Sequence, residues 1–266
     1  MIRKTKKIII FVAIIAVAAA LYFTSRGRKA NDNNARINAI GPTTQNQPET
    51  TKTPEPENKI EPKKEQPIPE EAPPSKEIPE KYLLDMPFYS QAPLSKWDAF
   101  HEDMCEEASI LNAGLYLEGK KLTKDQFESE LQKIQKTEKK EIGEWKSTTV
   151  AQTKKLVDAY FEGKIKSKII DSPTIEQIES EIAQNNPVIV PLAGRDIGNP
   201  NFTPPGPVYH MLVVKGYDSQ DFITNDVGTR KGNSYAYKKE VIMKNIHDWN
   251  KKDIHSGSKK VLVLYK

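Results

Sequence analysis

The sequence predicts an α+β domain, because helical patterns fill the first half of its folded part and strand patterns the second. In the first half, apolar residues recur every three or four positions, which is typical of helices with one buried face. In the second half, short runs rich in β-branched and aromatic residues are separated by turn residues, which favours an antiparallel sheet. We therefore expect N-terminal helices packed on an antiparallel β-sheet.

An unbroken apolar run at residues 8–23 follows the basic residues of segment 1–7. As a helix it spans roughly 24 Å, slightly less than a hydrocarbon core. The run predicts either a signal anchor or the apolar region of a cleaved signal peptide. We favour the anchor, because residues 21–23 continue the run beyond the alanines that could supply a cleavage site. Residues 1–7 would then stay in the cytoplasm and the rest would lie outside the membrane.

Residues 24–81 are expected to form a disordered, extended linker. Ten of the 19 prolines fall between Pro42 and Pro79, and the linker has no aromatic residue. The folded domain is then 82–266, which is long enough for one sizeable core. It carries equal numbers of acidic and basic residues, 26 of each, so the net charge of +4 belongs to the N-terminal segment. This balance argues against a nucleic-acid partner.

Four helices are expected in the first half of the domain. The first has Asp103 as its N-cap and stops at Gly119. The next two open with a threonine followed three residues later by glutamine, at Thr123 and Thr149, which is the spacing of a capping box. The fourth starts at residues 172–173, a serine followed by proline.

Five strands and a short helix are expected in the second half. A turn at 216–219 joins the second strand to the third, so these two form an antiparallel hairpin. The short helix lies within 241–249, before the last strand. The expected strands are 187–192, 209–218, 221–226, 234–238 and 259–265.

Cys105, the only cysteine of the chain, lies in the first turn of the first expected helix. A lone cysteine in an exported domain forms no internal disulfide, so it is either a small buried apolar residue or a reactive thiol. Unpaired N–H groups and the helix dipole favour a thiolate at a helix N-terminus. A nucleophilic thiol also needs a base, a group that orients the base, and donors for the oxyanion.

Three residues are candidates for these roles. His210 lies among apolar neighbours on the second strand, as either a core histidine or a base. Asp226 ends the next strand of the hairpin, where it would approach His210 and fix its tautomer. Gln91, fourteen residues before Cys105, offers a side-chain amide that could donate to an oxyanion.

In order and spacing, these residues resemble the papain-fold cysteine peptidases related to the double-glycine leader peptidases of bacteriocin exporters. The similar pieces are "MPFYSQ", "CEEAS", "YHMLVVKGYD" and "FITNDVG". The resemblance implies a papain-like cysteine peptidase fold with Cys105 as nucleophile, His210 as base and proton donor, and Asp226 as its orienter. It also implies an oxyanion hole made by Gln91 and the backbone N–H of Cys105.

Two differences from the family limit which of its properties can be assigned to this chain. The family pattern after the cysteine is Gly-Pro-Ala-Ser, whereas this chain has Glu106 and Glu107 before Ala108 and Ser109. Carboxylates beside the thiol disfavour a thiolate and should raise its pKa, most strongly if they do not point into solvent. The exporter relatives also join this domain to a transporter, so the double-glycine substrate is not carried over.

Some residues near the expected site allow two interpretations. Trp97 and Trp145 lie in loops and either line a substrate groove or pack at the edge of the core. The long loop at 193–210 is either a binding loop or a simple insertion. His101 ranks well below His210 as a base. No spacing indicates a metal site, and no cofactor is expected.

The sequence favours a membrane-tethered, extracytoplasmic thiol hydrolase that acts on peptide or amide bonds of a peptide or protein substrate. It would be secreted if the N-terminal segment is cleaved. Acyl transfer to an amine would use the same groups. The alternative is a surface-displayed peptide- or protein-binding module on the same fold, with an idle thiol, because a fold does not fix a function.

Overall fold

The computed structural model describes residues 77–143 and 146–266. The predicted segments 1–7 and 8–23, and the linker up to residue 76, lie outside the described residues. Within the described part, no helix is both long and apolar enough to span a bilayer. The expected boundary at residue 82 stays a prediction, although the first strand begins there.

One antiparallel sheet of seven strands forms the centre of the domain. Its strands lie in the order β2-β7-β3-β4-β5-β6, and the short β1 pairs with β4. Five of the strands match the expected ones within a residue at each end. The strands are β1 (Tyr82–Leu83), β2 (Lys166–Asp171), β3 (Val188–Ala193), β4 (Tyr209–Tyr217), β5 (Asp221–Asn225), β6 (Tyr235–Lys238) and β7 (Lys260–Tyr265).

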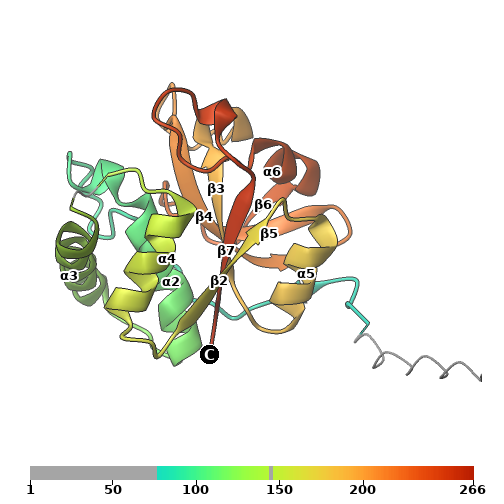
Figure 1. Cartoon of the computed structure of the whole chain (residues 1–266), viewed down its shortest axis with the longest axis horizontal. Coiled ribbons are helices and arrows are strands. Elements are labelled where there is room, and N and C mark those ends of the chain that lie inside the picture. The colour runs from blue at the N-terminus through green and yellow to red at the C-terminus, as the bar shows by residue number, and fades with distance from the viewer. Residues whose placement is uncertain (1–76, 144–145) are drawn as a thin grey trace, which may run out of the picture. The chain divides into compact units, whose positions relative to one another are not determined.

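Helices cover both faces of this sheet, with α2, α3 and α4 on one side and α5 and α6 on the other (Figure 1). The α+β class is therefore correct, with helices on a second face as well. The helices are α2 (Cys105–Glu118), α3 (Lys124–Ile142), α4 (Val150–Tyr160), α5 (Ile175–Ala183) and α6 (Lys239–Asn245).

Helix starts follow the capping residues except at two places. Both expected capping boxes are formed, from Thr123 and Thr149. The expected start of α5 at 172–173 is wrong, because Ser172 has a positive φ of 48° and Thr174 makes the cap. Asp103 is also not an N-cap. It lies in a 3₁₀ turn, His101–Asp103, and the N-cap of α2 is Met104, which makes no side-chain capping bond.

Strand β2 was not expected from the sequence. Its residues "KSKIID" alternate poorly, and it lies at the edge of the sheet, where it pairs only with β7. Edge strands tolerate exposed lysines because only one side of the backbone needs a partner. The period-two pattern that identifies a half-buried strand is therefore weak here.

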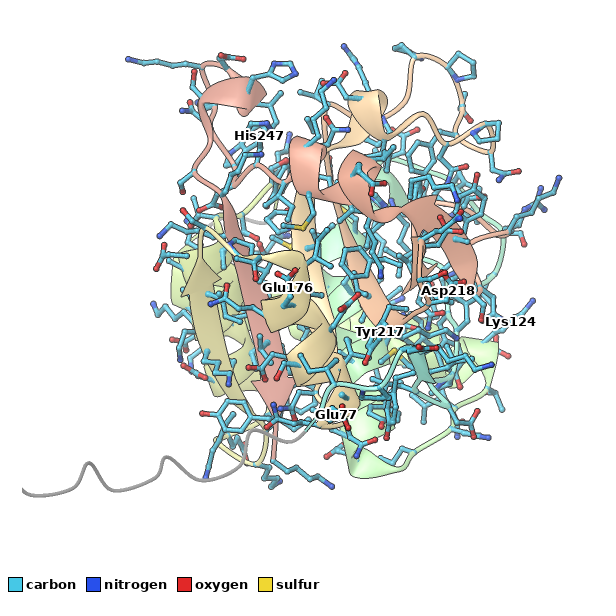
Figure 2. All side chains as sticks on the ribbon, turned by 90° about the vertical axis from the view of Figure 1, so that its right-hand side faces the viewer. Glu77, Lys124, Glu176, Tyr217, Asp218 and His247 are labelled. Atoms are coloured by element: carbon cyan, nitrogen blue, oxygen red, sulfur yellow. The ribbon has the colours of Figure 1, made fainter. Side chains whose placement is uncertain are left out.

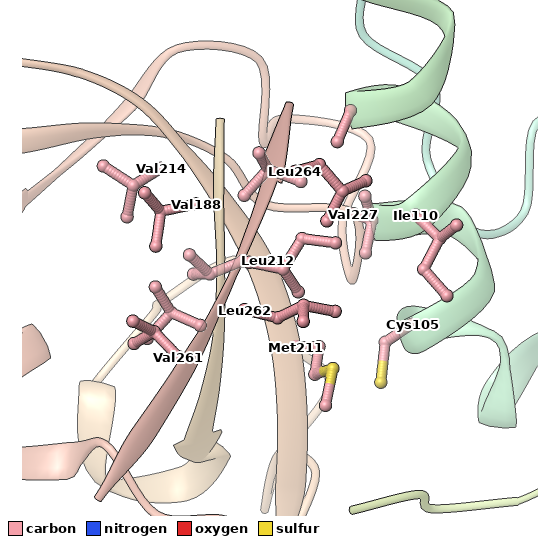
Figure 3. Packing of buried hydrophobic residues seen from close by; sticks show 14 of the residues in the cluster. Cys105, Ile110, Val188, Met211, Leu212, Val214, Val227, Val261, Leu262 and Leu264 are labelled. Atoms are coloured by element: carbon pink, nitrogen blue, oxygen red, sulfur yellow. The ribbon is translucent and has the colours of Figure 1, made fainter. Parts of the chain in front are cut away.

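The core lies between α2 and the central strands. Strand β4 is buried along its whole length, and α2 is buried from Cys105 to Leu115. Figure 3 shows Cys105 of α2 beside Met211 of β4. The Oγ of Ser109 donates to the carbonyl of Met211 at 3.2 Å, which fixes the helix against the strand.

The start of the described chain is fastened to the other end of β4. The hydroxyl of Tyr217 donates to the carbonyl of Pro79 at 2.9 Å, and Tyr82 pairs with Tyr217 in the sheet. Figure 2 labels Tyr217 above Glu77, the first described residue. The described chain therefore begins at this end of β4.

Gly114 should be replaceable by alanine only at a cost in stability. A Cβ there would lie 2.1 Å from the ring of Phe161, so the ring must move. We expect Gly114→Ala to lower the free energy of unfolding by about 1–3 kcal/mol in urea denaturation. Adding Phe161→Leu should recover part of this loss, because the two changes share one contact. Lys136→Ala, on the exposed side of α3, is the control; a Gly114→Ala variant as stable as this control would contradict the packing.

Candidate active site

Helix α2 begins at Cys105, and its thiol is 7% exposed. The sulfur contacts the carboxyl group of the next residue: the thiol donates to Oε2 of Glu106 at 2.9 Å. Burial raises the pKa of the Cys105 thiol well above its usual range, and the nearby Glu106 raises it further. The backbone N–H of Met211 acts in the opposite direction but is outweighed. At neutral pH the resting thiol is therefore neutral.

Glu106 is also buried, with 2% of its surface exposed. Its second oxygen, Oε1, accepts the backbone N–H of Thr148 at 2.8 Å, and the carbonyl of Thr148 accepts the hydroxyl of Tyr209 at 2.8 Å. Burial and the neighbouring Glu107 raise the pKa of Glu106 to about 8. The carboxyl group thus holds a proton at neutral pH.

Glu107 points to the other side of α2, where it meets Glu138 of α3. Both side chains are fully buried. Burial, together with the contact with Glu138, raises the pKa of Glu107 well above its usual range. The first turn of α2 thus buries two acidic groups that stay protonated at neutral pH. The option that these glutamates point into solvent is excluded.

His210, on β4, and Asp226, directly after β5, form a buried pair. Nε2 of His210 lies 2.8 Å from Oδ1 of Asp226. The other oxygen of Asp226 accepts the amide of Asn199 at 2.8 Å and the hydroxyl of Tyr237 at 2.6 Å. Burial alone would raise the pKa of Asp226, but His210 and these donors outweigh it, so the pKa lies below its usual range. Asp226 is therefore ionised.

The tautomer of His210 follows from this pair. Because the carboxylate of Asp226 only accepts hydrogen bonds, Nε2 carries the hydrogen and Nδ1 keeps its lone pair. Within the described residues, no hydrogen bond engages Nδ1. This nitrogen is therefore the one that can accept a proton.

Three neighbours fix the position of the His210 ring. The ring of Phe202 contacts it edge-on, with centroids 5.3 Å apart. A Cβ on Gly228 would lie 2.8 Å from Cε1 of the ring, and one on Gly194 would lie 2.9 Å from Cβ of His210. A larger residue at Gly228 would displace the ring, and one at Gly194 would clash with the carbonyl of Pro207 and the Cβ of His210.

Cys105 and His210 come from elements that pack against each other, α2 and β4. Met211, whose backbone N–H influences the thiol, directly follows His210. In the part of the chain that the structure describes, no hydrogen bond joins the sulfur to the imidazole, and the thiol is paired with Glu106 instead. The structure thus brings the two elements together and holds the thiol in a resting contact.

Gln91 lies beside the turn that precedes Cys105. Its Nε2 donates to the carbonyl of His101 at 2.8 Å and to that of Glu102 at 3.2 Å. Its backbone N–H donates to the carbonyl of Val227 at 2.9 Å, next to Asp226. Gln91 therefore connects the start of α2 to the loop after β5, and both of its amide hydrogens are used in this contact.

The remaining candidates are two tryptophans and His101, and in the described residues no hydrogen bond joins any of them to Cys105 or His210. Trp97 is exposed, and Trp145 is outside the described residues. His101 is held between the carboxylates of Asp98, at 2.7 Å, and Glu128, at 2.9 Å, so it has a structural environment. Among the described residues, no cluster of three metal-binding side chains occurs.

A cavity of about 290 Å³ opens next to the start of β4. Val208 and Trp249 line it, together with Arg195. The ring of Trp249 packs on that of Tyr209, with centroids 5.3 Å apart, and Tyr209 directly precedes His210. The cavity is a recess on the outer side of Trp249, and neither Cys105 nor His210 is among its lining residues.

Several residues of this site were not expected from the sequence. Asn199 and Tyr237, which hold Asp226, come from the 193–210 loop and from β6. The length of the loop pointed to this region but to no single residue. Glu106 was recognised only as an unfavourable neighbour of the thiol, because its burial depends on tertiary packing.

Comparisons with known proteins assign the family. The model of the Peptidase_C39 like family matches residues 83–253, most of the described domain. The chain belongs to this family. The resemblance to cysteine peptidases of the C39 group is therefore confirmed, and the C39-like domain includes Cys105, His210 and Asp226.

A crystal structure from Bacillus anthracis, named as that of a C39-like peptidase, is also similar to this C39-like chain. The two share 16% identity, the match covers 71% of this chain and 98% of the other, and the TM-score is 0.47. No curated protein matches the chain significantly.

The buried acids of this C39-like domain should make its stability depend on pH. Above about pH 4.5, an unfolded glutamate loses its proton, whereas folded Glu107 keeps it because its pKa is raised. Stability therefore falls as pH rises through this window, by up to about 1.4 kcal/mol per pH unit for one group.

In Glu107→Gln the free energy of unfolding should fall less steeply with pH than in the wild type, when urea unfolding is measured between pH 5 and 8. Glu240→Gln, on the exposed face of α6, should keep the wild-type slope. Equal slopes in Glu107→Gln and the wild type would show that Glu107 is not protonated in the folded state.

Proposed function

We propose that the protein is a membrane-tethered, extracytoplasmic cysteine peptidase or amidase. The observation that carries the proposal is the His210–Asp226 pair, whose Nδ1 is available as a base on the strand that packs against the helix of Cys105. Membership of the Peptidase_C39 like family supports the same chemistry. In this proposal Cys105 is the nucleophile, His210 the base and proton donor, and Asp226 the group that orients it.

The neutral thiol decides how the reaction starts. Because burial disfavours a thiolate, His210 does not hold a preformed ion pair with Cys105 but removes the thiol proton as the sulfur attacks. The thiol must therefore give up its hydrogen bond to Oε2 of Glu106 and turn its proton toward Nδ1 of His210. Asp226 stabilises the imidazolium that forms.

The rest of the cycle follows the usual course of acyl transfer. The sulfur–carbon bond forms, and the carbonyl oxygen becomes an oxyanion, which the backbone N–H of Cys105 stabilises at the start of α2. We assign Gln91 as the second donor, through the hydrogen that now makes the longer, 3.2 Å bond to Glu102. The carbon–nitrogen bond then breaks, His210 protonates the amine, and water resolves the thioester.

The proposed substrate is a peptide or protein outside the cytoplasm. The apolar run at 8–23 would tether the domain to the membrane, and the proline-rich linker would carry it away from the surface. The cavity beside Tyr209 and the exposed Trp97 are where substrate side chains would bind. We also assign Trp145 to substrate binding, from its place in the sequence.

One observation favours the alternative, a peptide-binding module without turnover. The thiol is buried and bonded to Glu106, so the resting state has no reactive thiolate. In such a module the same recess would bind a peptide, and Cys105 would serve only as a packing residue.

Cys105→Ala and His210→Ala should each lower hydrolysis at least about 10³-fold, because the nucleophile and its base act as a unit. The full-length protein is incubated with a mixed peptide library, and new peptide termini are identified by mass spectrometry. Circular dichroism checks that the variants fold. Val208→Ala, in the recess but away from the reacting atoms, should mainly change which peptides are cleaved.

Equal cleavage by Cys105→Ala and the wild type would refute the nucleophile. Saturable peptide binding without cleavage by either protein would favour the binding module.

A further inference from the structure

The thiol of Cys105 has a chemical partner that the proposed mechanism does not use. Oε2 of Glu106 lies 2.9 Å from the sulfur. Since Oε1 accepts the N–H of Thr148, it is the carbonyl-type oxygen, and the acidic proton belongs on Oε2. In the resting contact the thiol donates to a lone pair of this same oxygen, so the O–H of the carboxyl group lies next to the sulfur and is able to turn toward it once the thiol proton has left.

The surroundings of Glu106 keep this proton in place. The titratable groups around it are acidic or neutral: Cys105 and Glu107 on its own helix, and the Tyr209 hydroxyl from β4. The next titratable group beyond Tyr209 is also acidic, Asp248 after α6. In the described part of the chain, no ion pair links Glu106 to a basic residue. With 2% of its surface exposed, the carboxyl group also lacks water to stabilise a charge.

We propose that Glu106 is a further catalytic residue, whose neutral carboxyl group donates a hydrogen bond to the sulfur of Cys105 once His210 has taken the thiol proton. This inference rests on the proposed function and deepens it. A glutamate beside the thiol then stabilises the thiolate instead of repelling it, because a carboxylic acid that is kept neutral by its site can donate a hydrogen bond.

The proton balance of the step is simple. The thiol proton goes to Nδ1 of His210, which ends the hydrogen bond from the thiol to Oε2. The carboxyl proton stays on Oε2 and turns to donate a hydrogen bond to the sulfur. When the sulfur attacks the carbonyl, it gives up its charge to the oxyanion, and the hydrogen bond weakens again. Glu106 leaves the cycle with the proton that it held at the start.

The arrangement makes the site sensitive to alkaline pH. The pKa of Glu106 is raised to about 8, and above that value the carboxyl group becomes an anion next to the sulfur. Repulsion then opposes thiolate formation, and the donor is lost. Activity should therefore fall about tenfold per pH unit above the pKa of Glu106.

The test is the pH dependence of kcat/KM between pH 6 and 10 for the full-length wild type, Glu106→Gln and Glu106→Ala. Glutamine donates through its amide and cannot ionise, so Glu106→Gln should stay active and lose the alkaline decline. Glu106→Ala, which has no donor, should be about 10–100-fold slower at pH 7. Glu118→Gln, at the far end of α2, should keep the wild-type profile.

Two outcomes would overturn the proposal. One is a folded Glu106→Gln that is as slow as Glu106→Ala, which would mean that a carboxylate is required. The other is an unchanged alkaline decline in Glu106→Gln, which would assign the decline to another group.

Alkylation of Cys105 by iodoacetamide separates failure of this inference from failure of the proposed function. It needs no turnover, and Cys105 is the only thiol in the chain. Glu106→Gln should react faster than the wild type at pH 9, where the native carboxyl group is charged, and at a similar rate at pH 6.5. An equal rate at pH 9 would contradict the role of Glu106, whether or not the protein cleaves peptides.

Discussion

The contact between the Cys105 thiol and the buried carboxyl group of Glu106 governs this site. Because α2 is enclosed by the sheet on one side and by α3 on the other, the acids in its first turn cannot reach solvent. They are held neutral, and the thiol beside them is neutral as well. The chemistry of the site must therefore begin from two protonated groups, which sets the roles of His210 and of the donors around the sulfur.

The same contact links three distant parts of the chain. Glu106 binds the backbone of Thr148, which precedes α4, and Thr148 binds Tyr209 at the start of β4. The neighbouring residue, His210, is fixed from the other side by Asp226. The first turn of α2, the segment before α4 and the histidine strand are thus held in one network. A change in the protonation of Glu106 would therefore act on Cys105 directly and on the His210 strand through Thr148 and Tyr209.

Much of the fold follows from local patterns, and the parts that do not follow are those set by packing. Capping boxes at Thr123 and Thr149, and the β-branched and aromatic runs of β4 and β5, mark elements whose signals lie within a few residues. The hairpin of β4 and β5 placed Asp226 near His210 for the same reason. Burial of Glu106 and the bonds from Asn199 and Tyr237 to Asp226 depend on contacts between distant segments. No local pattern carries that information.

The most direct test of the central claim, a resting thiol that is neutral, is the ultraviolet absorbance of the thiolate. The difference between the wild type and Cys105→Ser, recorded from pH 5 to 10, isolates this one group because tyrosine ionisation cancels. We predict no thiolate at pH 7 and a signal that begins only at a pH well above that of an ordinary cysteine, since burial and Glu106 raise the pKa of Cys105. A full thiolate signal at pH 7 would show a preformed ion pair with His210 and contradict the account.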